Sequence, residues 1–334
     1  MTISIFIPVY NGQSYLPRTL NSVLRQSYSD LEILCVDDSS TDESYALLQE
    51  YAERDHRIQL FQKPNGGSVP PSWNFVIPHL RGEFTLYMSQ DDLLESDTIE
   101  GLVNRQRESG ADAVIPHEIH YVEGLALEEM HHLKGVGGDV TPVITGKEAF
   151  RLMINYSISG RALWPTRVIK QIGMPLDTYN DDEYAQRRWI LECDKVAFSE
   201  AVFFYIRNNP RSITERHSAK TYEEVLTNAK LLQLAEMTLQ EDPSFVQDLA
   251  NAYFYRLYYR MINFRQRKSE YSVHERKRII TVFRKAYVIL HSKSTLKNWK
   301  FRLGSWSFFS MNWVVWYKCL QYKRKNILLP FDLD

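Results

Sequence analysis

The sequence predicts an α/β protein with a mostly parallel, doubly wound sheet, followed by a helical C-terminal region. The first 115 residues alternate short apolar runs, typical of buried strands, with amphipathic stretches of helical length. From about Tyr222 onward the pattern is helical almost throughout. With 334 residues, 44% of them hydrophobic, the chain can bury the core of one large domain or of two smaller ones.

The strands are predicted from runs of β-branched and aromatic residues without polar alternation, as in strands buried on both faces. They cover residues 3–10, 31–38, 58–63, 83–88 and 111–115. A helix over 14–26 follows the first strand, because Leu16, Leu20 and Val23 lie on one stripe. The other expected helices run from the capping sequence SSTDES to about residue 52, to residue 82 with an interruption at Pro78, and over 95–108.

The rest of the chain divides by pattern. Residues 115–145 are rich in Gly, His and acids and predict insertion loops, and helices and short strands mix over 146–208. Long helices are expected over 222–239, 244–264 and 273–290. The change of pattern predicts a catalytic domain over 1–215 and a mainly helical region over 216–334.

The net charge of −1 hides an uneven distribution. From Asn251 to the end there are 18 Lys and Arg against four acidic residues, which gives this part about +14. The preceding 250 residues hold 22 basic and 37 acidic residues and carry about −15. This division predicts an anionic partner for the C-terminal part.

The cysteines and the N-terminus predict a cytoplasmic setting. Cys35, Cys193 and Cys319 are far apart in sequence and form no paired spacing, which favours a reducing compartment. The opening MTISIFIPVY lacks a basic segment and a small-residue cleavage site, so we interpret it as a strand and not as a signal peptide.

Two predicted strands end in adjacent carboxylates, Asp37-Asp38 and Asp91-Asp92, and the first strand ends in the aromatic sequence PVYN. Since ligands of open parallel sheets bind beyond the carboxyl ends of the strands, these residues predict one site with a stacking surface, a hydrogen-bond acceptor and oxygen ligands for Mg²⁺ or Mn²⁺. Such a site suits a nucleoside diphosphate. The alternative for either acid pair is a turn or a helix cap. No P-loop and no dinucleotide-binding glycine motif is present in the sequence.

These segments resemble the inverting family 2 glycosyltransferases of the GT-A fold. The resemblance rests on PVYNGQSYLPRTLNSVLRQSYSDLEILCVDDSSTDES, NGGSVPPSWNFVI, RGEFTLYMSQDDLLESD and RVIKQIGMPLDTYNDDEYAQRRW, and it covers roughly residues 3–210. It implies an enzyme that transfers a sugar from a nucleoside diphosphate donor, with UDP as the expected nucleotide, to a hydroxyl of a glycan or lipid-linked acceptor. It also implies a role in the biosynthesis of a surface polysaccharide or glycolipid.

The resemblance also implies roles for individual residues. Tyr10 would stack on the base and Asp38 would accept a hydrogen bond from it, with Pro8 and Asn11 shaping the pocket. Asp91 and Asp92 occupy the position of the acidic motif that contacts ribose, metal and diphosphate, and which of the two is the main metal ligand stays open.

Asp182 stands where the family has its general base. From the sequence alone, a cap on the helix that begins there is the alternative. Arg207 and Arg211 lie in RNNPRSIT, which is either a loop that closes on the diphosphate or a solvated turn. Two departures stand out: Ser89 replaces a common Asp, and Trp73 replaces a common Arg.

Residues 299–325 interleave Trp, Phe and Tyr with Lys and Arg, and polar residues interrupt every apolar run of spanning length. This pattern predicts a segment lying at a membrane surface, on the inner face of the cell membrane; the alternative is a helical subdomain with its aromatic residues packed inward. We expect no nucleic acid partner, because no binding motif accompanies the charge. The rival functions are an inactive nucleotide-sugar-binding scaffold, which Ser89 favours, and a sugar-nucleotidyltransferase.

Overall fold

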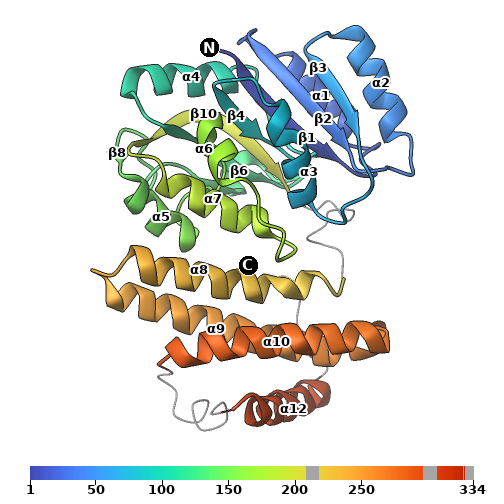
Figure 1. The fold of residues 1–334 in the computed structure, drawn as a ribbon, viewed down its shortest axis with the longest axis vertical. Helices are drawn as coiled ribbons and strands as arrows, with labels where there is room; N and C mark the ends of the chain where they lie inside the picture. Colours follow the sequence, from blue (N-terminus) through green and yellow to red (C-terminus); the bar gives the residue numbers. More distant parts are fainter. Residues whose placement is uncertain (208–217, 296–306, 326, 328–334) are drawn as a thin grey trace. The chain divides into compact units, whose positions relative to one another are not determined.

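A computed structural model describes residues 1–207, 218–295, 307–325 and 327 of the chain, which form two compact units (Figure 1). The N-terminal unit comprises residues 1–176 and 181–209, and the C-terminal unit comprises residues 177–180 and 210–334. The domain boundary predicted at residue 215 lies outside the described residues, so it stays a prediction.

One mixed sheet forms the centre of the N-terminal unit. Its strands are β1 (Ile3–Val9), β2 (Leu31–Asp37), β3 (Ile58–Gln62), β4 (Phe84–Tyr87), β5 (Leu93–Leu94), β6 (Ala113–Tyr121), β7 (His131–Leu133), β8 (Val143–Ile144), β9 (Leu163–Pro165) and β10 (Val196–Ile206). The order along the sheet is β3-β2-β1-β4-β9-β6-β10-β5, with β7 beside β6 and β8 beside β10. The β3-β2-β1-β4 part is parallel, and β6 pairs with β10 in parallel, whereas β9 runs antiparallel to β4 and β6. The predicted α/β class is confirmed.

Helices cover both faces of this sheet (Figure 1). They are α1 (Leu16–Leu24), α2 (Ser44–Arg54), α3 (Val69–Val76), α4 (Thr98–Ser109), α5 (Gly146–Ile154), α6 (Thr166–Ile172) and α7 (Asp181–Leu191). Pro78 falls in the short 3-10 turn Ile77–His79 that follows α3, where the predicted interruption lies.

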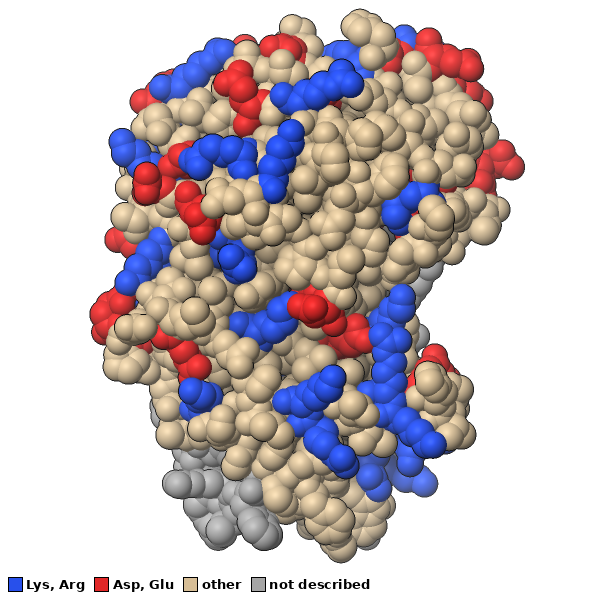
Figure 2. All heavy atoms as spheres, viewed as in Figure 1, with Lys and Arg blue, Asp and Glu red and all other residues tan. Residues whose placement is uncertain are grey.

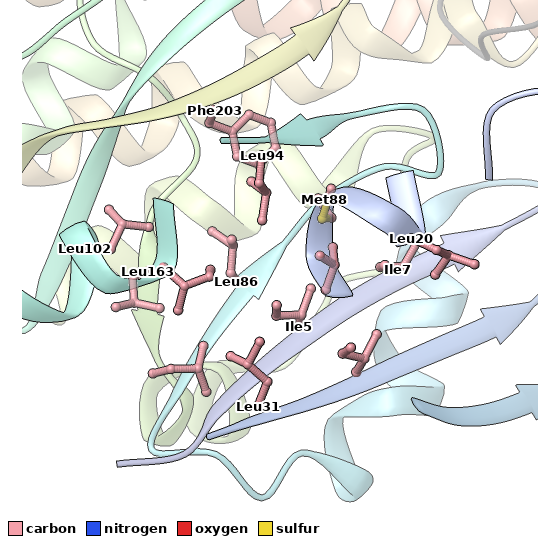
Figure 3. Close-up of a cluster of buried hydrophobic side chains, with 14 of the residues drawn as sticks. Ile5, Ile7, Leu20, Leu31, Leu86, Met88, Leu94, Leu102, Leu163 and Phe203 are labelled. Carbon is pink, nitrogen blue, oxygen red and sulfur yellow. The ribbon is translucent and has the colours of Figure 1, made fainter. Parts of the chain in front are cut away.

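The apolar core on one face of the sheet explains the placement of α1 and α4. Ile3, Ile5 and Ile7 alternate along β1 and point to the same side, because side chains two residues apart in a strand share a face. Figure 3 shows Ile5 and Ile7 in one cluster with Leu20 of α1. Leu86 of β4 and Met88, which follows β4, belong to the same cluster. All of these side chains are fully buried.

Aromatic side chains fill the opposite face and fix α7. Trp73 of α3 packs on Phe6 of β1 with ring centroids 4.6 Å apart and on Trp189 of α7 at 5.2 Å. Trp189 also contacts Trp164 of β9 at 5.6 Å. Three indoles from separate elements therefore hold the helix that begins with Asp181 and Asp182 against the sheet.

The C-terminal unit is helical, as predicted. Its helices are α8 (Glu224–Thr238), α9 (Pro243–Gln266), α10 (Val273–Lys293) and α12 (Phe308–Arg324). The first three pack against one another and α12 packs on α9. Within the parts of the chain that the structure describes, no helix combines the length and the hydrophobicity required to cross a membrane.

The prediction of insertion loops over 115–145 is wrong for part of that range. β6 continues to Tyr121, and β7 and β8 lie within the range. The run HEIHY reads as polar, yet Glu118 points inward and is buried, while His117 and His120 pair with histidines of β7. Satisfied polar side chains therefore replace the apolar residues expected of a strand.

Candidate donor-binding and catalytic site

The carboxyl ends of three parallel strands meet at one edge of the sheet. β1 lies between β2 and β4, with Val9 opposite Asp37 and Phe6 opposite Tyr87. The residues that follow these strands, Tyr10, Asp38 and Asp91, therefore lie on one rim, as the sequence predicts. This rim is the position where open parallel sheets bind ligands.

Gln90 fixes the backbone of Tyr10. Its Oε1 accepts from the Tyr10 N–H at 2.8 Å, and its Nε2 donates to the Tyr10 carbonyl at 3.1 Å. A Cβ on Gly12 would collide with the same amide, so glycine permits this close approach. The Tyr10 ring and Pro8 are half-buried and lie two residues apart on the same face of the strand end. Gln90 thus ties the aromatic end of β1 to the acidic loop.

Asn11 joins the end of β1 to the loop between β2 and α2. Its φ of 53° lies in the left-handed region, which Asn adopts more readily than most residues. Its N–H donates to Ser40 Oγ at 2.9 Å, and its Oδ1 accepts from the Thr41 N–H at 2.7 Å. Asn11 therefore sets the shape of the rim through the backbone of the neighbouring loop.

Both carboxylates of the first acid pair are buried. Asp37 is fully buried and accepts from the Ser40 N–H and from Gln62, each at 3.1 Å. Asp38 forms an ion pair with Lys63 and accepts from the Gly66 N–H at 3.0 Å. A carboxylate offers about four acceptor positions, so these contacts hold Asp38 in place without using all of them.

The second pair consists of one half-buried and one buried carboxylate. Asp91 is half-buried at the rim, whereas Asp92 is fully buried. Asp92 Oδ2 accepts from the Ser89 N–H at 2.9 Å, and Oδ1 accepts from the Ile206 N–H at 3.3 Å. Burial raises the pKa of Asp92 to about 7, which Arg161 counteracts and Asp91 reinforces.

Arg161 is the cation that faces Asp92. Its Nη2 lies 3.5 Å from Asp92 Oδ2, and its Nη1 lies 3.1 Å from Glu118 Oε2. The guanidinium covers the Tyr205 ring at 4.3 Å. Burial would raise the pKa of Glu118, but Arg161 together with His120 and Ser159 outweighs it and lowers the pKa to about 2. Arg161 therefore links the acidic loop to β6 and β10.

The acid pair can accept a divalent ion only as part of a shared coordination sphere. Among the described residues, no group of three or more His, Cys, Asp or Glu side chains is arranged to hold a metal. Asp91 is accessible, whereas Asp92 must exchange its contact with Arg161 to reach an ion. Mg²⁺ commonly takes one or two protein carboxylates beside phosphate oxygens and water, so the residues present fit an ion that arrives with a diphosphate.

Asp182 lies in the first turn of α7. Burial, and then the charge of Glu183, raises the pKa of Asp182 to about 6, while backbone N–H groups of the first turn oppose the shift. The charges of both Asp182 and Asp92 act on the buried Tyr87 hydroxyl and help raise its pKa, after the larger effect of burial. The Tyr87 hydroxyl is therefore near enough to both the first turn of α7 and the acidic loop for their charges to act on it.

The remaining predicted residues have different positions. Arg207 stacks over the Tyr205 ring at 5.6 Å, on the strand that also contacts Arg161 and Asp92. Arg211 lies outside the described residues. Trp73, which replaces a common Arg, is fully buried in the aromatic core and does not line the rim.

Sequence reasoning missed Gln90, Arg161 and Glu118. Gln90 directly precedes the acid pair in sequence, and its amide can both donate to and accept from a backbone peptide group. Its position and chemistry could therefore have identified it as a residue that shapes the acidic loop. Arg161 is 69 residues from Asp92 in sequence and 43 from Glu118, and no local pattern marks a contact of that range.

The comparisons with known proteins agree with this geometry. Residues 4–167 match the family model described as Glycosyl transferase family 2. Glycosyltransferase GlyA of Streptococcus pneumoniae serotype 4 is 26% identical over 218 residues, which is 64% of this chain and 31% of GlyA. The matched part thus spans about a third of the length of that relative.

Solved structures share the fold. S. aureus TarS 1–349 in complex with UDP-GlcNAc aligns with 98% of this chain and 92% of its own, with a TM-score of 0.67 and 16% identity. The mannosyltransferase PcManGT from Pyrobaculum calidifontis, in complex with GDP-Man and Mn²⁺, aligns with 96% of this chain and 87% of its own, with a TM-score of 0.52 and 15% identity. Residues 4–167 therefore form a domain of glycosyl transferase family 2 with the GT-A fold, and this chain is a member of that glycosyltransferase family.

Proposed function

We propose that the chain is a metal-dependent, inverting glycosyltransferase that uses a nucleoside diphosphate sugar, with UDP as the nucleotide. The observation that carries the proposal is the rim where Tyr10, Asp38 and Asp91 follow three adjacent parallel strands of a family 2 domain. Tyr10 offers a stacking face for the base, and Asp38 offers a fixed acceptor. The related fold of TarS, with UDP-GlcNAc bound to that protein, supports the choice of nucleotide.

Asp91 and Asp92 are the proposed metal ligands. A bound Mn²⁺ or Mg²⁺ would neutralise the charge that develops on the leaving diphosphate. Asp91 is accessible from the rim, and Asp92 stands behind it with Arg161 as its present partner. Arg207 and Arg211 follow the strand that contacts Asp92, and we propose that they contact the diphosphate.

Asp182 is the proposed general base. Inversion is assisted by a general base, here a carboxylate, that removes the proton from the acceptor hydroxyl as the new bond forms on the face opposite the diphosphate. A pKa of about 6 leaves Asp182 ionised at neutral pH and makes it a stronger base than an ordinary Asp.

The proposed acceptor is a hydroxyl of a glycan or lipid-linked saccharide in surface polysaccharide or glycolipid biosynthesis, at the cytoplasmic face of the cell membrane. A nucleotide-sugar-binding scaffold without turnover is the second candidate. Ser89 stands where an Asp is common, so the acidic loop has one carboxylate fewer. A sugar-nucleotidyltransferase has less support, since the loop PVYNGQSYL lacks the glycine-rich, basic character of that class.

Calorimetry of UDP binding tests the proposal, with Mn²⁺, Mg²⁺ or EDTA, on the wild type, Asp91→Asn and Asp92→Asn. We expect binding that requires the metal and that Asp91→Asn weakens. Metal-dependent binding without hydrolysis or transfer to any glycan acceptor would favour the scaffold. Absence of nucleotide binding under every condition would contradict both candidates.

A further inference from the structure

The C-terminal helix α12 carries a continuous exposed aromatic stripe. Phe309, Trp313 and Tyr317 follow one another at intervals of four residues and are 77%, 60% and 59% exposed. Trp316 and Leu320 are exposed beside them. At about 100° per residue, these five side chains lie within an arc of about 100° on the helix. They form one face, which we call the aromatic stripe.

The opposite face of α12 already has its partner. Met311 and Val315 are fully buried, and Cys319 donates to the Ile262 carbonyl of α9. Phe308 packs on Tyr287 of α10 with ring centroids 5.6 Å apart. The aromatic stripe is therefore not the side that holds α12 in the C-terminal unit. Scattered single apolar residues are normal on a surface, but a contiguous stripe of large ones indicates an interaction site.

The chemistry of the stripe indicates what covers it. Trp and Tyr have an apolar body and a polar end, and such side chains concentrate where a membrane meets water. Lys323 is exposed and borders the aromatic stripe. Lys318 and Lys325 lie farther from the stripe around the helix axis. The sequence from Phe308 to Arg324 contains no acidic residue. Lys and Arg side chains also gather over the neighbouring helix α10 (Figure 2). A cationic helix with an aromatic face fits an anionic lipid surface.

We propose that α12 binds an anionic membrane surface, lying parallel to it with the aromatic stripe at the depth of the lipid head groups. The membrane contact is inferred from the geometry of α12 and does not depend on the proposed function. Its role rests on the proposed function: the contact would keep the enzyme at the surface where a lipid-linked acceptor is held. Within the membrane segment predicted over 299–325, this proposal concerns one face of α12, and residues 299–306 lie outside the described part.

Flotation of the full chain with vesicles tests this proposal. Vesicles of phosphatidylglycerol and phosphatidylcholine are compared with vesicles of phosphatidylcholine alone, at low and high salt. The test variant is Phe309→Ser with Trp313→Ser, and the matched control is Met237→Ser, an equally exposed apolar residue of α8. Because all three side chains are largely exposed, we expect the variants to fold, which circular dichroism checks.

We expect binding to the anionic vesicles, a loss of at least about tenfold in the test variant, and no change in the control. Lys323→Glu should weaken binding by about fivefold or more, since each cation near an anionic surface contributes that much. Absence of vesicle binding by the wild type, or equal binding by the test variant, would overturn the proposal. So would a dimer, detected by light scattering, that the test variant abolishes.

Nucleotide calorimetry on the same variant separates this proposal from the proposed function. Retained metal-dependent UDP binding with lost flotation would support both proposals. Flotation by a wild type that binds no nucleotide would support the membrane contact and contradict the transferase.

Discussion

Replacement of Arg161 by Met should destabilise the N-terminal unit strongly. The Arg161 side chain is 16% exposed and faces Asp92 and Glu118, which are 0% and 4% exposed. Met keeps the apolar stem but leaves two buried carboxylates without their cation. Breaking a buried pair by removal of one partner costs about 3–5 kcal/mol. For a unit of this size, about 2–4 °C per kcal/mol corresponds to a fall in Tm of about 6–20 °C.

The chain offers a matched control in Arg167. Its Nη2 lies 2.7 Å from Asp112, closer than Arg161 lies to either partner, but its side chain is 62% exposed. An exposed ion pair contributes about 0–1 kcal/mol, so Arg167→Met should lower Tm by less than about 4 °C. The comparison separates burial from distance as the cause of the effect.

Thermal unfolding followed by near-ultraviolet circular dichroism measures both variants. A third variant, Arg161→Met with Asp92→Asn, removes one of the orphaned charges and should regain part of the loss. If Arg161→Met unfolds within about 1 kcal/mol of Arg167→Met, the claim that this cation holds the acidic loop is wrong. If the third variant recovers no stability, the lower stability of Arg161→Met comes from lost packing of the Arg161 side chain and not from the unpaired carboxylates.

Four further changes test other parts of the site. Asp182→Asn should lower the rate of transfer by about 10²–10⁴-fold, and the wild-type rate should rise with pH through about 6. Because its folded pKa lies above the ordinary 3.8, Asp182 stabilises the fold only at low pH and this contribution disappears as pH rises through 6, so Asp182→Asn should be no less stable than wild type at pH 7 in urea unfolding. Trp73→Arg, which restores the residue common in the family, should cost more than about 3 kcal/mol because it buries a charge in the aromatic core; a soluble variant of wild-type Tm would contradict this. Asn11→Gly should lose the hydrogen bond to Thr41 but keep the backbone, whereas Asn11→Ala should lose about 1 kcal/mol more from its positive φ, as chemical denaturation would reveal. Gln90→Ala should weaken UDP binding more than it affects folding, since its amide holds the backbone of Tyr10, and unchanged calorimetry would refute that role.

The sequence was sufficient wherever one short segment determines the structure. Runs of β-branched residues predict the buried strands directly. The parallel arrangement of β1, β2 and β4 follows from the helices between them. That arrangement alone places Tyr10, Asp38 and Asp91 on one rim. The acid pairs were visible because they end apolar runs.

The sequence was insufficient wherever the structure depends on distant partners. β6 pairs in parallel with β10, about 80 residues later, and its polar run HEIHY predicts a loop when only the local sequence is considered. Arg161 precedes a three-residue strand, and nothing around it predicts that its guanidinium joins Asp92 to Glu118. The burial of Asp37, Asp38 and Asp92, and the half-buried position of Asp91, also depend on neighbouring strands and could not be derived from two adjacent letters.

The distribution of charge at the rim bears on how a diphosphate can bind there. The first 250 residues carry about −15, which opposes the approach of an anion. Arg161 and Lys63 are close to the acidic residues of the rim, but each already neutralises a carboxylate, Asp92 in one case and Asp38 in the other. The charge of an arriving diphosphate therefore needs cations beyond these two. A divalent ion held at the acidic loop would meet that need, because it would arrive with the phosphate and bring positive charge that Arg161 and Lys63 do not supply.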